Sequence, residues 1–67
     1  MTQRELNNIN VGDEIYDSKW YELLKVSKAY TTGLKVIHYW KNDYGVFHES
    51  IYLSKQVLLT DRYRMEI

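Results

Sequence analysis

Apolar or aromatic side chains recur at every second residue over most of the stretch from Leu24 to Tyr52, and this period of two constrains the fold more than any other feature. Side chains of a β-strand point alternately to opposite faces, whereas one face of a helix recurs every three or four residues. The clearest alternation sets Leu34, Val36, His38 and Trp40 against Lys35, Ile37, Tyr39 and Lys41. The pattern predicts strands that bury one face of a sheet.

Turn residues flank this central strand on both sides. Thr31-Thr32-Gly33 and Asn42-Asp43-Tyr44-Gly45 predict two tight hairpins. In the first of them we expect Gly33 to supply a positive φ, which glycine adopts without a steric penalty. The predicted strands are Glu14–Tyr16, Trp20–Tyr30, Leu34–Trp40, Val46–Leu53 and Tyr63–Ile67.

Two segments are compatible with more than one structure. Trp20–Tyr30 is long enough for a helix, but its apolar face does not continue past Leu24, and a turn follows directly. We therefore favour a strand and leave the helix open. Lys55–Thr60 fits either a short strand or one helical turn that starts near Ser54.

The N-terminal segment carries a helix start signal. Thr2 and Glu5 have the spacing of a capping box, in which each side chain accepts a hydrogen bond from the other residue's backbone. This spacing predicts one helical turn that ends near Asn7, with Leu6 and Ile9 as its apolar anchors.

These elements fit one small, mainly β domain over residues 1–67. Five short strands with tight turns favour either a bent five-stranded antiparallel sheet or a small barrel, with a short N-terminal helical turn. Val11-Gly12-Asp13-Glu14-Ile15 resembles the opening of SH3-like barrels of the Tudor and KOW types, and the hairpin Leu24–Trp40 follows where their meander would. The resemblance covers about half the chain and implies the fold alone. The proline-peptide signature of SH3 domains is missing from the sequence.

The composition bounds the class of protein. The chain has no cysteine, which fits a reducing compartment and excludes thiol catalysis. Its longest apolar runs are far shorter than the roughly 20 residues of a membrane span. We therefore expect a cytoplasmic protein without membrane contact, or one in the host cytoplasm if it is viral. Nine basic and nine acidic side chains cancel, so the net charge attracts neither nucleic acid nor lipid.

The sequence offers little for catalysis or for a cofactor. His38 and His48 could approach Asp43 or Glu49 across a hairpin, but a zinc site needs three or four ligands at close spacing. His48 and its neighbours Glu49 and Ser50 alternate across one strand and cannot form a relay. We expect a protein that is not an enzyme and holds no metal or other cofactor.

The ten aromatic rings favour a binding function. We expect a core of this size to hide about half of the seven Tyr, two Trp and one Phe. Tyr and Trp are enriched at protein interfaces. The chain thus reads as a small protein-binding module, of the kind that bacteriophages and mobile elements use to modulate host proteins. A homodimer would bury exposed aromatic rings in the same way. The candidate anchors are Trp20, Tyr21, Tyr44 and Phe47.

A cluster of lysines supports an alternative function. The stretch from Leu23 to Asn42 contains four lysines and no carboxylate. Ammonium groups with rings between them suit a nucleic-acid groove, although lysines on a solvated face also protect a sheet from aggregation. The nucleic-acid face would consist of Lys25, Lys35, Tyr39 and Lys41.

Overall fold

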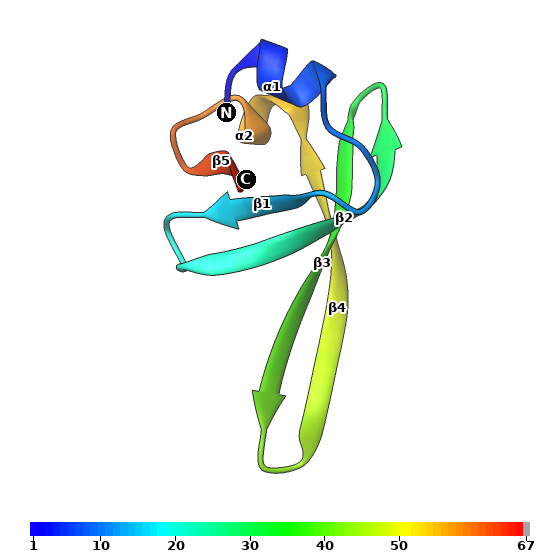
Figure 1. Ribbon diagram of the computed structural model, residues 1–67, viewed down its shortest axis with the longest axis vertical. Helices are drawn as coiled ribbons and strands as arrows, with labels where there is room; N and C mark the ends of the chain where they lie inside the picture. Colours follow the sequence, from blue (N-terminus) through cyan, green and yellow to red (C-terminus); the bar gives the residue numbers. More distant parts are fainter. Residues whose placement is uncertain (67) are drawn as a thin grey trace.

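A computed structural model describes residues 1–66 as one five-stranded antiparallel sheet with two short helices (Figure 1). The sheet order is β4-β3-β2-β1-β5, and the sheet is bent but not closed, so β4 and β5 are its edges. The predicted mainly β fold is confirmed, in its bent-sheet form. The elements are α1 (Gln3–Asn7), β1 (Glu14–Asp17), β2 (Glu22–Tyr30), β3 (Gly33–Asn42), β4 (Gly45–Ser54), α2 (Lys55–Leu58) and β5 (Tyr63–Glu66). Residue 67, the end of the last predicted strand, lies outside the described residues.

The segment that the sequence left open is the strand β2, which excludes a helix there. It contains a bulge. Val26 pairs with Val36, but the next pair along the ladder is Lys28 with Lys35, so Ser27 is an extra residue. A bulge of one residue moves every later side chain to the opposite face. The bulge therefore puts Lys28 on the face of the sheet that carries Lys35.

Aliphatic side chains fill the core, which lies on one face of the sheet. We call this the core face and its opposite the outer face. The core residues are Leu6, Ile9, Ile15, Leu24, Val26, Leu34, Val36, Leu53, Leu58 and Tyr63.

The expectation that about half of the aromatic rings are buried is wrong. Of the ten rings, Tyr63 is buried, Tyr16 is half-buried and the other eight are exposed, because they lie in turns, on the outer face or on the part of the hairpin beyond the core.

The capping box predicted for the N-terminus is present in α1. The Glu5 backbone N–H donates to the Thr2 hydroxyl at 3.1 Å, and the Thr2 N–H donates to the Glu5 carboxylate at 2.8 Å. These bonds satisfy N–H groups that have no partner inside the helix. Leu6 and Ile9 are both buried, so the two predicted anchors are confirmed.

The segment after β4 is a helical turn, α2, which begins after Ser54. The Ser54 hydroxyl accepts a hydrogen bond from the Val57 N–H at 3.4 Å. The α-amino group of Met1 donates to the carbonyl oxygens of Leu58 at 3.0 Å and Tyr63 at 2.5 Å, which ties α1 to the connection between α2 and β5. In the described part of the chain, neither helix has the length and apolar character that crossing a membrane would need.

Glycine is required at position 33 for a reason that differs from the prediction. Positive φ angles occur at Gly12 and Gly45, but not at Gly33. A Cβ atom at Gly33 would instead overlap the carbonyl oxygen of Leu53 and would lie 2.9 Å from the Cα atom of Ser54. The β3 backbone thus passes so close to the end of β4 that only a hydrogen fits between them.

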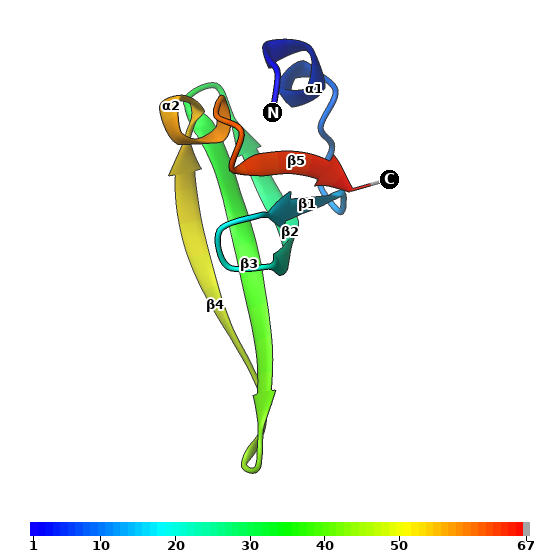
Figure 2. The same ribbon diagram turned by 90° about the vertical axis from the view of Figure 1, so that its left-hand side faces the viewer.

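The hairpin of β3 and β4 extends beyond the rest of the molecule. Pairing between β2 and β3 ends at Leu24 and His38, whereas β3 and β4 stay paired to Asn42 and Gly45. Residues 39–48 therefore form a free two-stranded ribbon, which we call the distal arm (Figures 1 and 2). The arm gives the molecule its elongated extents of 39 × 21 × 20 Å.

Candidate functional site

Exposed aromatic residues cover both faces of the distal arm. Trp40 and Phe47 are cross-strand partners on the core face, with ring centroids 5.9 Å apart and planes inclined by 22°. On the outer face, the rings of Tyr39 and His48 lie 5.8 Å apart. Cross-strand ring pairs of this kind stabilise a hairpin. An isolated two-stranded ribbon is only marginally stable in water, so the rings hold the arm together while one side of each stays open to solvent.

The tip of the arm is the most exposed aromatic position of the described chain. Tyr44 is 91% exposed, and its backbone N–H donates to the Asn42 side chain at 2.8 Å. That bond fixes the loop without covering the ring. Val46, next to the tip, is 69% exposed. None of the core residues within the described part of the chain lies on the arm, so the apolar surface of the tip is not part of the core.

The turn between β1 and β2 presents the other two predicted anchors. Trp20 is 61% exposed and Tyr21 is 81% exposed. Tyr21 has a φ of 55°, in the left-handed region that costs a non-glycine residue energy. The turn is tied to the chain before β5, because the Ser18 N–H and hydroxyl both donate to the Arg62 carbonyl oxygen at 2.8 Å.

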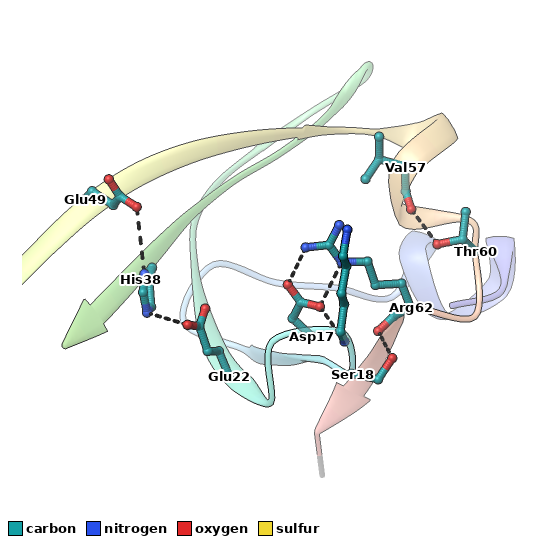
Figure 3. A network of polar contacts seen from close by, with 9 residues as sticks. Asp17, Ser18, Glu22, His38, Glu49, Val57, Thr60 and Arg62 are labelled. Atoms are coloured by element: carbon teal, nitrogen blue, oxygen red, sulfur yellow. Dashed lines mark hydrogen bonds and ion pairs between the residues drawn. The ribbon is translucent and has the colours of Figure 1, made fainter.

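A two-point ion pair supports the same turn (Figure 3). The Arg62 guanidinium donates to both oxygens of the Asp17 carboxylate at 2.8 Å, and Asp17 is 3% exposed. The hydrogen bonds from Arg62 hold the pKa of Asp17 below its usual range, and they outweigh the burial that would raise it. The Lys19 N–H, which also donates to Asp17 at 3.0 Å, acts in the same direction.

The predicted protein-binding residues do not form one surface. Trp20 and Tyr21 lie on the β1–β2 turn, whereas Tyr44 and Phe47 lie on the distal arm, which extends away from that turn in both views (Figures 1 and 2). Phe47 is 39% exposed, and its partner Trp40, which the prediction did not include, is exposed to the same extent. The two rings belong to one cluster because strand pairing places them opposite each other.

An open cleft of about 450 Å³ lies on the core face, beside the base of the arm. The cleft runs between the β1–β2 turn, the paired strands β3 and β4, and α2. Its lining residues are Asp17, Trp20, Glu22, Leu24, His38, Glu49, Ile51, Leu53, Val57, Arg62 and Tyr63. Sequence reasoning did not identify this cleft, because its residues come from five separate segments of the chain.

Three polar side chains of the cleft lining lie in a row. His38 Nε2 lies 3.2 Å from a carboxylate oxygen of Glu22, and His38 Nδ1 lies 3.8 Å from one of Glu49 (Figure 3). The permanent cation in the described lining, Arg62, is already paired with Asp17. Two carboxylates thus share one imidazole, and with Asp17 the carboxylates of the described lining outnumber its permanent cation.

The predicted lysine face is assembled as expected. Lys35, Tyr39 and Lys41 alternate along β3, and Lys25 pairs with Ile37, so all four predicted residues lie on the outer face. The bulge in β2 adds Lys28 to this surface. Glu14 lies opposite Lys25 on β1, however, and Glu66 lies opposite Glu14 on β5. The lysines are therefore gathered on the half of the outer face over β2, β3 and β4, whereas the half over β1 and β5 carries Glu14, Glu66 and Arg64.

The two histidines lie on opposite faces of the hairpin. His38 pairs with Glu49 on the core face, and His48 pairs with Tyr39 on the outer face. They cannot bind one metal ion together. Among residues 1–66, no group of three His, Cys, Asp or Glu side chains has the geometry to hold a metal ion.

Comparison of the chain with protein families, with curated proteins and with solved structures gave no match.

Proposed function

We propose that this chain is a non-enzymatic module that binds a protein partner through the distal arm. The observation that carries the proposal is the projection of residues 39–48 beyond the core with apolar side chains exposed on both faces and at the tip. Exposed large apolar groups gathered on one feature mark interaction sites, and rings are the preferred anchors of protein interfaces. A partner that covers the arm would bury these rings and stabilise the ribbon at the same time.

The lack of cysteine suits a module that acts in the cytoplasm. A small domain with an exposed arm suits a modulator that covers part of a larger protein. The turn with Trp20 and Tyr21 is a secondary contact in this proposal, because both rings are exposed but the turn lies apart from the arm tip (Figures 1 and 2).

The test compares an exposed tyrosine of the arm with an exposed tyrosine at the other end of the sheet. The wild-type protein is immobilised and incubated with the soluble proteins of a candidate host. The partner that binds stoichiometrically is purified, and its affinity for each variant is measured by titration. We expect Tyr44→Ser combined with Val46→Thr to weaken the affinity about tenfold or more. The control Tyr30→Ser, at the end of β2 opposite the arm, should bind within about threefold of wild type. The proposal fails if no partner binds stoichiometrically, or if the arm variant binds like the wild type.

A second function is favoured by one specific observation, the gathering of Lys25, Lys35, Tyr39 and Lys41 on the outer face. Lysines beside rings can bind a nucleic-acid backbone with little sequence preference. This function predicts that binding of a single-stranded oligonucleotide weakens steeply with salt and that Lys35→Gln and Lys41→Gln each reduce the salt slope. Absence of binding at low salt would exclude it.

A further inference from the structure

The two edges of the sheet differ in how they are protected against pairing with another strand. The edge strand β5 is four residues long and carries Arg64 and Glu66 on its outer face. The edge strand β4 is ten residues long and contains no lysine, arginine or proline. Short length, charge and proline are the devices by which natural sheets block their edges. Within the described residues, β4 is long and has no proline, its one carboxylate is Glu49, and no strand covers its outer side.

The register of the hairpin shows which residues of β4 offer their backbone groups. The pair that closes a two-residue hairpin loop is of the hydrogen-bonded kind, and the two kinds of pair alternate along the ladder. The closing pair here is Asn42 with Gly45. The bond from the Lys55 N–H to the Thr32 carbonyl, 3.0 Å long, agrees with this alternation at the other end of the ladder. The residues that direct N–H and C=O groups away from β3 are therefore Val46, His48, Ser50 and Tyr52.

The side chains that an added strand would meet on the core face form a simple pattern. Phe47, Glu49 and Ile51 follow one another on this face of β4 at intervals of two residues. The pattern is apolar, acidic, apolar. Glu49 shares His38 with Glu22, and the cleft beside it holds no cation free to pair with these carboxylates among its described lining residues. A strand with a basic side chain opposite Glu49 would supply the missing charge.

On these grounds we propose that the outer edge of β4 binds an extended segment of the partner protein, which adds as a sixth strand and places Lys or Arg opposite Glu49. This inference rests on the proposed protein-binding function and names the chemistry of the partner. Apolar residues two positions before and after the basic residue would pack on Phe47 and Ile51. Backbone bonds along the edge would supply affinity, and the alternate side chains would supply specificity.

The same pattern argues against a second copy of the chain as the occupant. In a continuous antiparallel sheet, side chains on the same face must pair, so Glu49 would meet Gly45, Phe47, Glu49, Ile51 or Leu53 of the second copy. None of these side chains is basic. Self-pairing would therefore leave the carboxylate uncompensated or place it opposite another carboxylate, which is destabilising.

The test is selection from a displayed library of random ten-residue peptides against the wild-type protein. We expect the enriched sequences to share Lys or Arg with apolar residues two positions away on both sides. When the same library is selected for binding to the Glu49→Lys variant, the enriched peptides should carry Asp or Glu in place of the shared Lys or Arg. Glu14→Lys, which reverses an exposed carboxylate on the outer face, is the matched control and should select the wild-type pattern. Failure to enrich peptides, or the same pattern with Glu49→Lys, would overturn the proposal.

A second measurement separates strand addition from binding by side chains alone. Ser50→Pro removes one outward N–H from β4 without removing a donor to β3 and should weaken the winning peptide about tenfold, whereas Ser50→Ala should leave its affinity unchanged. Equal affinities for the two variants would exclude pairing at this edge. If peptide selection fails while partner capture still depends on Tyr44 and Val46, the strand-addition proposal falls and the arm proposal stands.

Discussion

Arg62 and Asp17 form an ion pair that joins the chain before β5 to the end of β1, 45 residues away in sequence, through two hydrogen bonds of 2.8 Å. The carboxylate is almost fully buried and the guanidinium is partly exposed. Because bidentate Arg–carboxylate pairs fix orientation as well as charge, this pair sets the position of the turn that carries Trp20 and Tyr21.

Removal of the charge at Asp17 should therefore destabilise the domain. We expect Asp17→Asn to lower the free energy of unfolding by about 1–3 kcal/mol, since the buried acceptor for Arg62 and for the Lys19 N–H is weakened. Urea unfolding followed by circular dichroism measures the change. The control is Asp61→Asn at the neighbouring exposed carboxylate, with an expected effect within about 0.5 kcal/mol. Equal effects of the two variants would show that the ion pair does not support the fold.

The ion pair also predicts the pH dependence of stability. The pKa of Asp17 is lowered in the folded state, chiefly by the hydrogen bonds from Arg62. A carboxyl with a lowered pKa contributes stability that is complete above its unfolded pKa of about 4. That contribution is lost as the pH falls from there through the folded pKa.

Unfolding measured between neutral pH and pH 2 should show this loss in the wild type and a smaller loss in Asp17→Asn. Part of the loss should persist in the variant, because the pKa of Glu5 is lowered by its bonds to Thr2. Parallel curves for the two proteins would contradict the prediction.

The strands were predictable because the evidence for a strand is local. Alternation from Leu34 to Trp40 and the loop residues before Gly45 each act within a few residues, and both appear in the structure as expected. The helical turn after Ser54 is one of the two structures that the sequence left open. The capping box at Thr2 is equally local. The sequence thus determines where chain segments change direction and which face of each strand is apolar.

The site was less predictable because it depends on where strands end relative to one another. The distal arm exists because β2 pairs with β3 only as far as His38, and no local pattern sets that limit. The meeting of Glu22 with His38 and Glu49 depends on the register of three strands. The alternation of β3 did predict that Lys35 and the other lysine-face residues lie together, since one strand and one neighbour suffice for that.

Gly33 illustrates a constraint that the sequence shows but does not explain. We expect Gly33→Ala to lower the free energy of unfolding by about 1–3 kcal/mol, because the new methyl group meets the backbone of Leu53 and Ser54 rather than a mobile side chain. Thermal unfolding measures the loss. Ser50→Ala, at an exposed position of β4, is the control and should change the stability by less than about 0.5 kcal/mol. An unchanged melting temperature in Gly33→Ala would mean that β3 and β4 can move apart at this position without a loss of stability.

Tyr21 combines high exposure with a strained backbone, and this combination permits a test of whether the residue serves the fold or an interaction. Its φ of 55° disfavours any residue with a Cβ atom, while its ring contributes little to the core. Tyr21→Gly should therefore raise the free energy of unfolding by about 0.5–1 kcal/mol. Tyr44→Gly, at an exposed tyrosine without a positive φ, should give no such gain. Chemical unfolding of the two variants under the same conditions makes the comparison. A loss of stability in Tyr21→Gly would show that the ring packs on the domain after all. A gain would mean that the chain tolerates backbone strain at a residue that does nothing for its stability, as is common where a side chain contacts a partner.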